Sequence, residues 1–293
     1  MMSLFISGLI GLSMIAMQEK SVMQRDLEKM INGSGATIAV AAEHLGTGKQ
    51  ILIDEKRMFH AASTMKTPVM IEVYQQAAGG RLALSDSIEI RNAFRSIVDS
   101  SVFSMDLGED SDDEVYKRVG SKMSVSDLVY AMITVSSNFA TNVLIDLVDA
   151  KKVTATMREL GAADIKVLRG VEDLKAYRLG MNNETNAFDL LVIMKAIASG
   201  TAVSAEASSD MVRVLLDQKF GDKIPGKLPK DVRVAHKTGS ITGVEHDSGI
   251  VFMADGQAYV LVLLSDGWED QKAGRGILAD ISRRIYDHYA KGM

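Results

Sequence analysis

The chain has 293 residues, of which 47% are hydrophobic and 24% are charged, and its formal net charge is −5. This composition is typical of a globular protein that can bury a sizeable core, and it excludes collagen-like, coiled-coil and disordered proteins. The negative charge offers no basic surface for nucleic acid, and the lack of cysteine excludes disulfides, thiol nucleophiles and zinc–thiolate or iron–sulfur sites.

Residues 4–17 form an apolar run near the N-terminus. The run is too short for an ordinary membrane-spanning helix and has the length of the apolar core of a signal peptide. Because no Lys or Arg precedes it, an apolar helix that docks on the protein body is the alternative. We expect residues 1–17 to be a signal peptide and the protein to be periplasmic or secreted, with the cytoplasm as the alternative. No later stretch has the roughly 18 apolar residues of a membrane span, so none is expected after processing.

The hydrophobic periodicity changes twice along the chain. Residues 35–45 and 50–55 have strand character and flank a hairpin loop at 46–49. Helical spacing then predicts helices at 63–78, 124–135, 141–149, 186–199 and 204–218. Strand patterns return at 232–238, 249–253 and 258–264, and an amphipathic helix covers 274–291.

This order predicts an α/β (α+β) fold class. We expect one antiparallel sheet made of N- and C-terminal strands and flanked by helices, with an all-helical subdomain inserted between them. The sheet subdomain covers about 22–62 and 220–293, the helical subdomain covers about 63–219, and both belong to a single catalytic domain at 18–293. The acidic residues 106–114 lack the ligand spacing of a calcium loop, and we interpret them as a solvated loop.

Ser63 and Lys66 are three residues apart at the predicted start of a helix, so their side chains share one face. A neutral lysine can take the proton of the serine hydroxyl, provided that burial and nearby cations lower the lysine pKa. The free N–H groups of a helix start can also help to form an oxyanion hole. Such a pair arises by chance about once in a chain of this length, and a capping serine beside a surface lysine is the alternative.

Two further motifs favour a catalytic Ser63–Lys66 pair over a capping serine beside a surface lysine. A Ser-Ser-Asn sequence at 136–138 falls at the break between two predicted helices, and Lys-Thr-Gly-Ser at 237–240 ends a predicted strand. In this order, the three motifs resemble those of the class A β-lactamases and of the wider superfamily of β-lactamases and penicillin-binding proteins. The resemblance extends from about residue 35 to residue 289, and it implies a β-lactamase/transpeptidase-like fold and a serine hydrolase.

The resemblance also implies roles for individual residues. Ser63 would be the acylated nucleophile, Lys66 its base or proton relay, and Ser136 the donor of a proton to the leaving nitrogen. Backbone N–H groups of Ser63 and Ser240 would form the oxyanion hole. The substrate-binding residues would be Asn138, Lys237, Thr238 and Ser240.

Glu172 stands in the loop where class A enzymes carry the glutamate that activates the deacylating water. We therefore predict that it is the general base, and a surface carboxylate is the alternative. The chain departs from the class A pattern in four places. Ser137 replaces the usual aspartate, no proline follows Glu172, Ala176 replaces an asparagine, and the strand after Lys237 has no evident arginine.

The predicted function is that of a serine β-lactamase that acts through a Ser63 acyl-enzyme with deacylation assisted by Glu172. The alternatives are a penicillin-binding-like D-Ala-D-Ala peptidase or esterase and a slowly acylating sensor or binding module. We expect a monomer without a metal or organic cofactor that takes a small β-lactam or peptidoglycan-like substrate. The histidines lack metal-ligand spacing and are interpreted as structural, and His246 is interpreted either as a substrate contact or as a turn residue.

Overall fold

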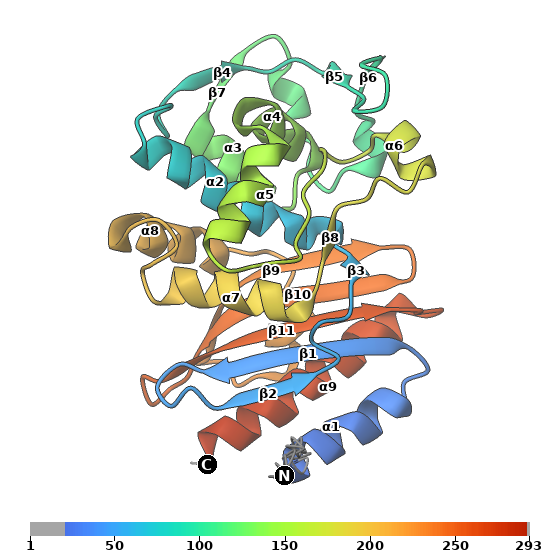
Figure 1. Cartoon of the computed structure of the whole chain (residues 1–293), viewed down its shortest axis with the longest axis vertical. Coiled ribbons are helices and arrows are strands. Elements are labelled where there is room, and N and C mark those ends of the chain that lie inside the picture. The colour runs from blue at the N-terminus through green and yellow to red at the C-terminus, as the bar shows by residue number, and fades with distance from the viewer. Residues whose placement is uncertain (1–20, 292–293) are drawn as a thin grey trace, which may run out of the picture.

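The structure is a computed structural model that describes residues 21–291 (Figure 1). The predicted signal peptide at 1–17 therefore lies outside the described residues. The centre of the fold is a five-stranded antiparallel sheet in the order β2-β1-β11-β10-β9. Its strands are β1 (Thr37–His44), β2 (Gln50–Ile53), β9 (Arg233–Ile241), β10 (Val244–Phe252) and β11 (Ala258–Asp266). The predicted sheet of N- and C-terminal strands is confirmed.

The two faces of the sheet are covered by different helices (Figure 1). Along β1, Ile38 and Val40 pack with the terminal helices α1 (Val22–Asn32) and α9 (Gln271–Ala290). The alternate residues Ala39 and Ala41 belong to the core on the other face. Because successive strand residues point to opposite faces and both faces are covered, β1 is buried along nearly its whole length. The sheet is therefore the middle layer between the terminal helices and the helical part.

The helical part lies on the face of the sheet opposite α1 and α9 (Figure 1). It begins with the 3₁₀ turn η1 (Ala62–Met65), which leads into α2 (Lys66–Ala78). α2 is buried along most of its length and packs against α4 and α5. The other helices are α3 (Val125–Thr134), α4 (Asn138–Val148), α5 (Ala150–Glu159), α6 (Leu174–Arg178), α7 (Ala187–Ala198) and α8 (Ala205–Leu216).

Short strand pairs fasten the segments between these helices. They are β3 (Phe59–His60) with β8 (Glu184–Thr185), β4 (Ser87–Glu89) with β7 (Lys122–Ser124), and β5 (Phe94–Arg95) with β6 (Val102–Phe103). The remaining 3₁₀ turns are η2 (Leu107–Glu109), η3 (Tyr116–Arg118) and η4 (Ile224–Lys227). Within residues 21–291, no helix combines the length and the apolar character that crossing a membrane requires.

Several predicted boundaries were wrong. The helix predicted from residue 63 starts as a 3₁₀ turn, and the one predicted from 141 already begins at Asn138. Helices α1, α5 and α6 were not predicted from the sequence. β10 begins at Val244 rather than at 249, because the polar residues Glu245, His246 and Asp247 are paired inside the sheet and buried there.

Candidate active site

Ser63 sits on a tight turn between β3 and α2. The preceding residue, Ala62, has a left-handed backbone with φ +44°, and its N–H donates to Nδ1 of His60 at 3.0 Å. Thr64 closes the turn by donating its hydroxyl to the carbonyl of Ala61 at 2.6 Å. The turn leaves Ser63 half-buried at the wall of a cavity, while its neighbours are buried. This is the geometry of an accessible hydroxyl on a rigid support.

Lys66 is fully buried, so the alternative of a surface lysine was wrong. Its ammonium group donates to the Ser136 carbonyl at 2.6 Å, to Asn138 Oδ1 at 2.8 Å and to Ser136 Oγ at 3.2 Å. Burial lowers the pKa of Lys66 to about 7, although the negative charges of Asp110 and Glu172 oppose that shift. About half of the molecules therefore carry a neutral Lys66 amine at pH 7.

Ser136 lies at the break between α3 and α4, in a left-handed backbone conformation with φ +59°. Ser137 caps α4 by accepting the N–H of Ala140 at 3.3 Å. The Ser136 hydroxyl also accepts a hydrogen bond from Lys237 Nζ at 3.1 Å, so it lies between two amines. Burial, together with the charges of Lys66 and Lys223, holds the pKa of Lys237 well below its usual range. The Ser136 hydroxyl is thus within hydrogen-bond distance of both the Lys66 and the Lys237 amines.

The end of β9 lies against the turn that carries Ser63. Gly239 makes this approach possible, because a Cβ atom there would lie only 3.2 Å from the backbone nitrogen of Ser63 and from the Cβ of Ala62. The strand thus brings Lys237, Thr238 and Ser240 to the same place as Ser63. A cavity of about 360 Å³ lies between the Ser63 turn, the start of α4 and the end of β9. Its lining residues are Ser63, Ser111, Ser136, Asn138, Phe220, Asp222, Lys223, Thr238, Ser240 and Arg275.

Glu172 is connected to this group through Asn138. Its Oε1 accepts the side-chain N–H of Asn138 at 3.0 Å, while Oδ1 of the same amide accepts from Lys66. Glu172 is half-buried and has a left-handed backbone with φ +62°. This geometry agrees poorly with the alternative of a solvated surface carboxylate, because the carboxylate is bonded to the amide that holds Lys66.

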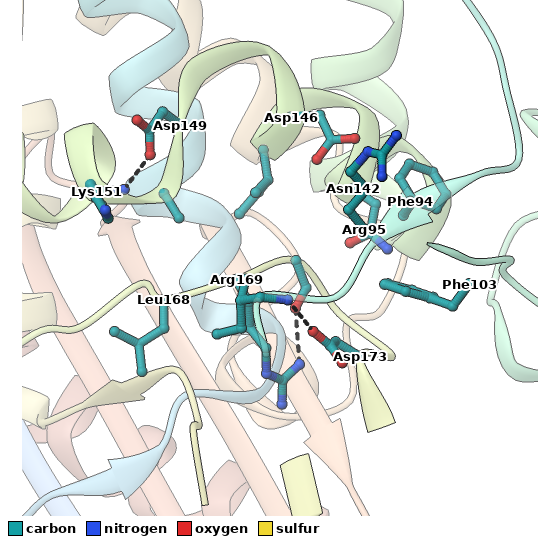
Figure 2. Close-up of a pocket in the computed structure, with 14 residues that line it drawn as sticks. Phe94, Arg95, Phe103, Asn142, Asp146, Asp149, Lys151, Leu168, Arg169 and Asp173 are labelled. Atoms are coloured by element: carbon teal, nitrogen blue, oxygen red, sulfur yellow. Dashed lines mark hydrogen bonds between the residues drawn. The ribbon is translucent and has the colours of Figure 1, made fainter. Parts of the chain in front are cut away.

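The loop that carries Glu172 is clamped from behind. Asn142 on α4 accepts the N–H of Val171 at 2.7 Å and donates to its carbonyl at 3.0 Å. Asp173 accepts the hydroxyl of Ser96 and the N–H of Ile97, each at 2.9 Å. A cavity of about 420 Å³ lies behind this loop. Asn142, Arg169 and Asp173 are among the residues that line it (Figure 2). The clamp fixes the backbone on both sides of Glu172.

A buried charge cluster that was not predicted from the sequence lies at one end of the cavity. Lys223 Nζ lies 2.6 Å from Glu245 Oε2 and donates to Ser240 Oγ at 2.8 Å. The other Glu245 oxygen accepts from Arg275 on α9 at 2.8 Å. Cationic groups therefore reach the site from Lys223 and Arg275 rather than from the strand after Lys237. The signal in the sequence was Glu245 itself, since an acid inside a buried strand requires a cationic partner.

His246 is neither a turn residue nor a group that faces the cavity, so both interpretations of it were wrong. It lies fully buried inside β10, where Nδ1 accepts the N–H of Ser265 at 3.0 Å and Nε2 lies 2.9 Å from the carbonyl of His60. Burial lowers the pKa of His246 to about 4, so the ring is neutral at pH 7. Its role is to fasten β10 to the strand that precedes the Ser63 turn.

The acidic residues 106–114 are not merely a solvated loop. Asp110 accepts the backbone N–H groups of Asn138 and Phe139, each at 2.9 Å, and Ser111 lines the cavity. The prediction was wrong for this part of the segment, because two N–H groups at the start of α4 need acceptors.

Comparison with known proteins agrees with this geometry. A model of the β-lactamase enzyme family matches residues 22–289. The chain belongs to this family. The resemblance proposed from the three motifs is thereby confirmed, and so is the fold. The family has the fold of a serine hydrolase, and membership in it implies β-lactam-like substrates.

The relatives of this β-lactamase-family chain have different stated roles. The extended-spectrum β-lactamase PER-1 of Pseudomonas aeruginosa is 22% identical over 93% of this chain and 89% of its own length. The β-lactamase regulatory protein BlaB of Streptomyces cacaoi is 20% identical over 90% of this chain and 96% of its own length. The crystal structure of a β-lactamase from Sphaerobacter thermophilus DSM 20745 is 27% identical, with a TM-score of 0.76, and the match covers 90% of this chain and 97% of that one.

Proposed function

We propose that this protein is a serine β-lactamase that opens the β-lactam amide through an acyl-enzyme on Ser63. The observation that carries this proposal is the buried Lys66 amine, which has a pKa of about 7 and is held by Ser136 and Asn138. A lysine in that state exists in its neutral form at physiological pH and can act as a base. No metal or organic cofactor takes part in the proposed reaction.

In the acylation step, the Ser63 hydroxyl attacks the lactam carbonyl carbon and its proton passes to the neutral Lys66 amine. Backbone N–H groups of Ser63 and Ser240 stabilise the oxyanion. When the carbon–nitrogen bond breaks, the proton passes from Lys66 through the Ser136 hydroxyl to the leaving nitrogen. The Lys66 amine nitrogen and the Ser136 hydroxyl oxygen are 3.2 Å apart, which is within hydrogen-bond distance.

Substrate orientation follows from the polar groups around the cavity. Lys237 and Thr238 attract the carboxylate of the substrate, and the Asn138 amide holds its acylamino side chain. In the deacylation step, Glu172 takes a proton from water, the resulting hydroxide attacks the Ser63 ester, and the serine leaves with a returned proton. The bond from Asn138 to Glu172 at 3.0 Å supports this assignment, because one amide orients both the base for acylation and the base for deacylation.

Turnover of the chromogenic cephalosporin nitrocefin, together with intact-protein mass spectrometry, tests the proposal. We expect steady turnover that Ser63→Ala abolishes. Ser209→Ala serves as the matched control, because Ser209 is an exposed serine on α8 outside the cavity, and this variant should keep the wild-type rate. Absence of both turnover and adduct in the wild-type protein would refute the proposal.

A second candidate function is a slowly acylating sensor. It is favoured by Ala176, which is buried four residues after Glu172 and has no polar group to position a water molecule, and a relative with a regulatory name is consistent with it. In that case, penicillin would give a stable Ser63 adduct without turnover. A D-Ala-D-Ala peptidase or esterase would instead release product from a peptide or ester substrate. For each of these activities, we propose a periplasmic or secreted location, which proteolytic mapping of the mature N-terminus would test.

A further inference from the structure

Asp110 reaches the active site from the acidic segment 106–114. Oδ1 of its carboxylate accepts the N–H of Asn138 and Oδ2 accepts the N–H of Phe139, each at 2.9 Å. These are the first two residues of α4, and N–H groups at a helix start have no partner inside the helix. The Asp110 carboxylate therefore binds the helix start through both oxygens, at the end where a negative charge is favourable.

The next residue holds the other side of the same break. Ser111 donates its hydroxyl to the carbonyl of Val135, the residue that follows α3, at 2.6 Å. Ser136 lies between these two attachment points in its left-handed conformation. A serine keeps that conformation only where its surroundings hold it. The pair Asp110–Ser111 thus fixes the backbone on both sides of Ser136.

This attachment bears directly on Lys66. The Ser136 carbonyl and the Asn138 side chain are two of the three acceptors for the Lys66 ammonium group. Asp110 is bonded to the backbone of Asn138, and it also contributes a negative charge close to that ammonium group. Asp110 does not bond to Ser63 or Lys66 in any contact that the structure describes for residues 21–291, so its effect passes through the residues that do.

We propose that Asp110 is a positioning residue for acylation: it holds Ser136 and Asn138 where they receive the Lys66 amine, and its charge sets how readily that amine loses a proton. This inference rests on the function proposed above. It assigns a catalytic contribution to a segment whose sequence predicts only a solvated loop.

Charged groups act on Lys66 from several elements. Asp110, from the acidic segment, and Glu172, from its loop, both favour the protonated amine. The charge of Lys66 in turn lowers the pKa of Lys237 on β9, and the charge of Lys223 lowers it as well. Burial opposes the charge of Lys66. Removing the charge of Asp110 therefore lowers the pKa of Lys66 below about 7 and shifts the acid side of the acylation profile to lower pH.

The test is the acylation rate of Ser63 as a function of pH, measured by mass spectrometry with penicillin, for Asp110→Asn. The asparagine keeps the size of the side chain but turns one acceptor into a donor that faces the N–H of Asn138 or Phe139. We expect a roughly tenfold slower acylation at pH 8, where Lys66 is mostly neutral in both proteins, equivalent to one lost hydrogen bond. We also expect the acid limb of the pH profile, the range in which acylation slows as Lys66 becomes protonated, to move to lower pH.

Two variants make the test specific. Asp113→Asn removes the same charge from an exposed side chain of the same segment, which pairs with Lys117; it should keep both the rate and the acid limb of the wild type. Asp110→Glu keeps the charge but displaces it, so it should slow acylation while leaving the acid limb in place. Asp110→Glu also takes the place of Asp110→Asn in the test if Asp110→Asn does not fold.

The outcomes separate this inference from the function on which it rests. A wild-type protein that forms no Ser63 adduct would overturn both. A reactive wild-type protein together with an unchanged rate in Asp110→Asn, or with a slower rate and an unmoved acid limb, would overturn the role of Asp110 alone. If Asp110→Glu is the variant that folds, an unchanged acylation rate or a moved acid limb in it would do the same.

Discussion

The pKa of Lys66 makes acylation depend on pH in a defined way. The amine is fully buried, and burial lowers its pKa from 10.5 to about 7. A pKa that stayed at 10.5 would leave about one molecule in three thousand with a neutral amine at pH 7, whereas a pKa of about 7 leaves about half. Desolvation thus raises the concentration of the active base by about three orders of magnitude.

The pKa of Lys66 also determines how the acylation rate changes with pH. At pH 5, about one Lys66 in a hundred is neutral, so the acylation rate should be about fiftyfold lower than at pH 7. Between pH 7 and pH 8 the rate should rise less than twofold and approach a plateau. Stopped-flow acylation by nitrocefin between pH 5 and pH 8, with circular dichroism to verify that the protein stays folded, measures this curve.

The variant Lys66→Arg tests the role of Lys66 as the base for acylation. A guanidinium group keeps the positive charge but stays protonated at every pH in this range. We expect its acylation to be at least a hundredfold slower than that of the wild type at pH 7, as for the loss of a general base. A flat wild-type profile between pH 5 and pH 8, or normal acylation by Lys66→Arg, would refute the assignment of Lys66 as the base.

Three further predictions concern the parts that surround the site. Gly170→Ala should slow deacylation and lower Tm, because its Cβ would lie 2.2 Å from Asn142 Oδ1 in the clamp behind Glu172; single-turnover kinetics and a thermal melt measure both effects. Gly274→Ala should lose about 1–3 kcal/mol of stability in a denaturant titration, since its Cβ would lie 2.6 Å from Trp268. Gly276→Ala, in the same helix and with open space around it, should gain about 0.5–1 kcal/mol; equal effects of the two changes would contradict this packing. For His246, the folded pKa of about 4 lies below the ordinary 6.5, so the unfolded chain binds more protons between these values and stability falls as the pH drops from 6.5 towards 4. Unfolding titrations should show that the wild type loses about 3 kcal/mol more than His246→Gln over that range, and parallel pH curves would exclude a neutral buried ring.

The sequence was sufficient to predict those site residues that lie in local motifs. Ser63 and Lys66 share a helix start and Ser136 lies at a helix break, so the motif and the change of secondary structure coincide at these positions. Such signals are local, so they can be recognised in the sequence without knowledge of the tertiary contacts. Lys237 lies inside β9, which continues to Ile241, beyond the predicted strand end at 238. The terminal strands were predictable for a similar reason, because both faces of β1 and β11 are buried and their sequences are correspondingly apolar.

The contributions of Lys223, Arg275 and Asp110 could not be predicted in the same way. Lys223 and Arg275 meet only because Glu245 binds both of them inside the fold. Asp110 is one of several acids in its segment, and nothing local distinguishes the one that reaches the start of α4. Each of these roles depends on which distant N–H group or charge the side chain meets, and such long-range pairing is determined by the packing of the whole molecule.

The fate of a single adduct shows whether Glu172 releases the Ser63 acyl-enzyme. Wild-type protein and Glu172→Gln are mixed with penicillin, the excess is removed, and intact-protein mass spectra are recorded over time. We expect Glu172→Gln to accumulate one adduct, located on Ser63, that disappears at least a hundredfold more slowly than the wild-type adduct. Equal rates of adduct loss in the two proteins, or an adduct on a residue other than Ser63, would contradict this expectation.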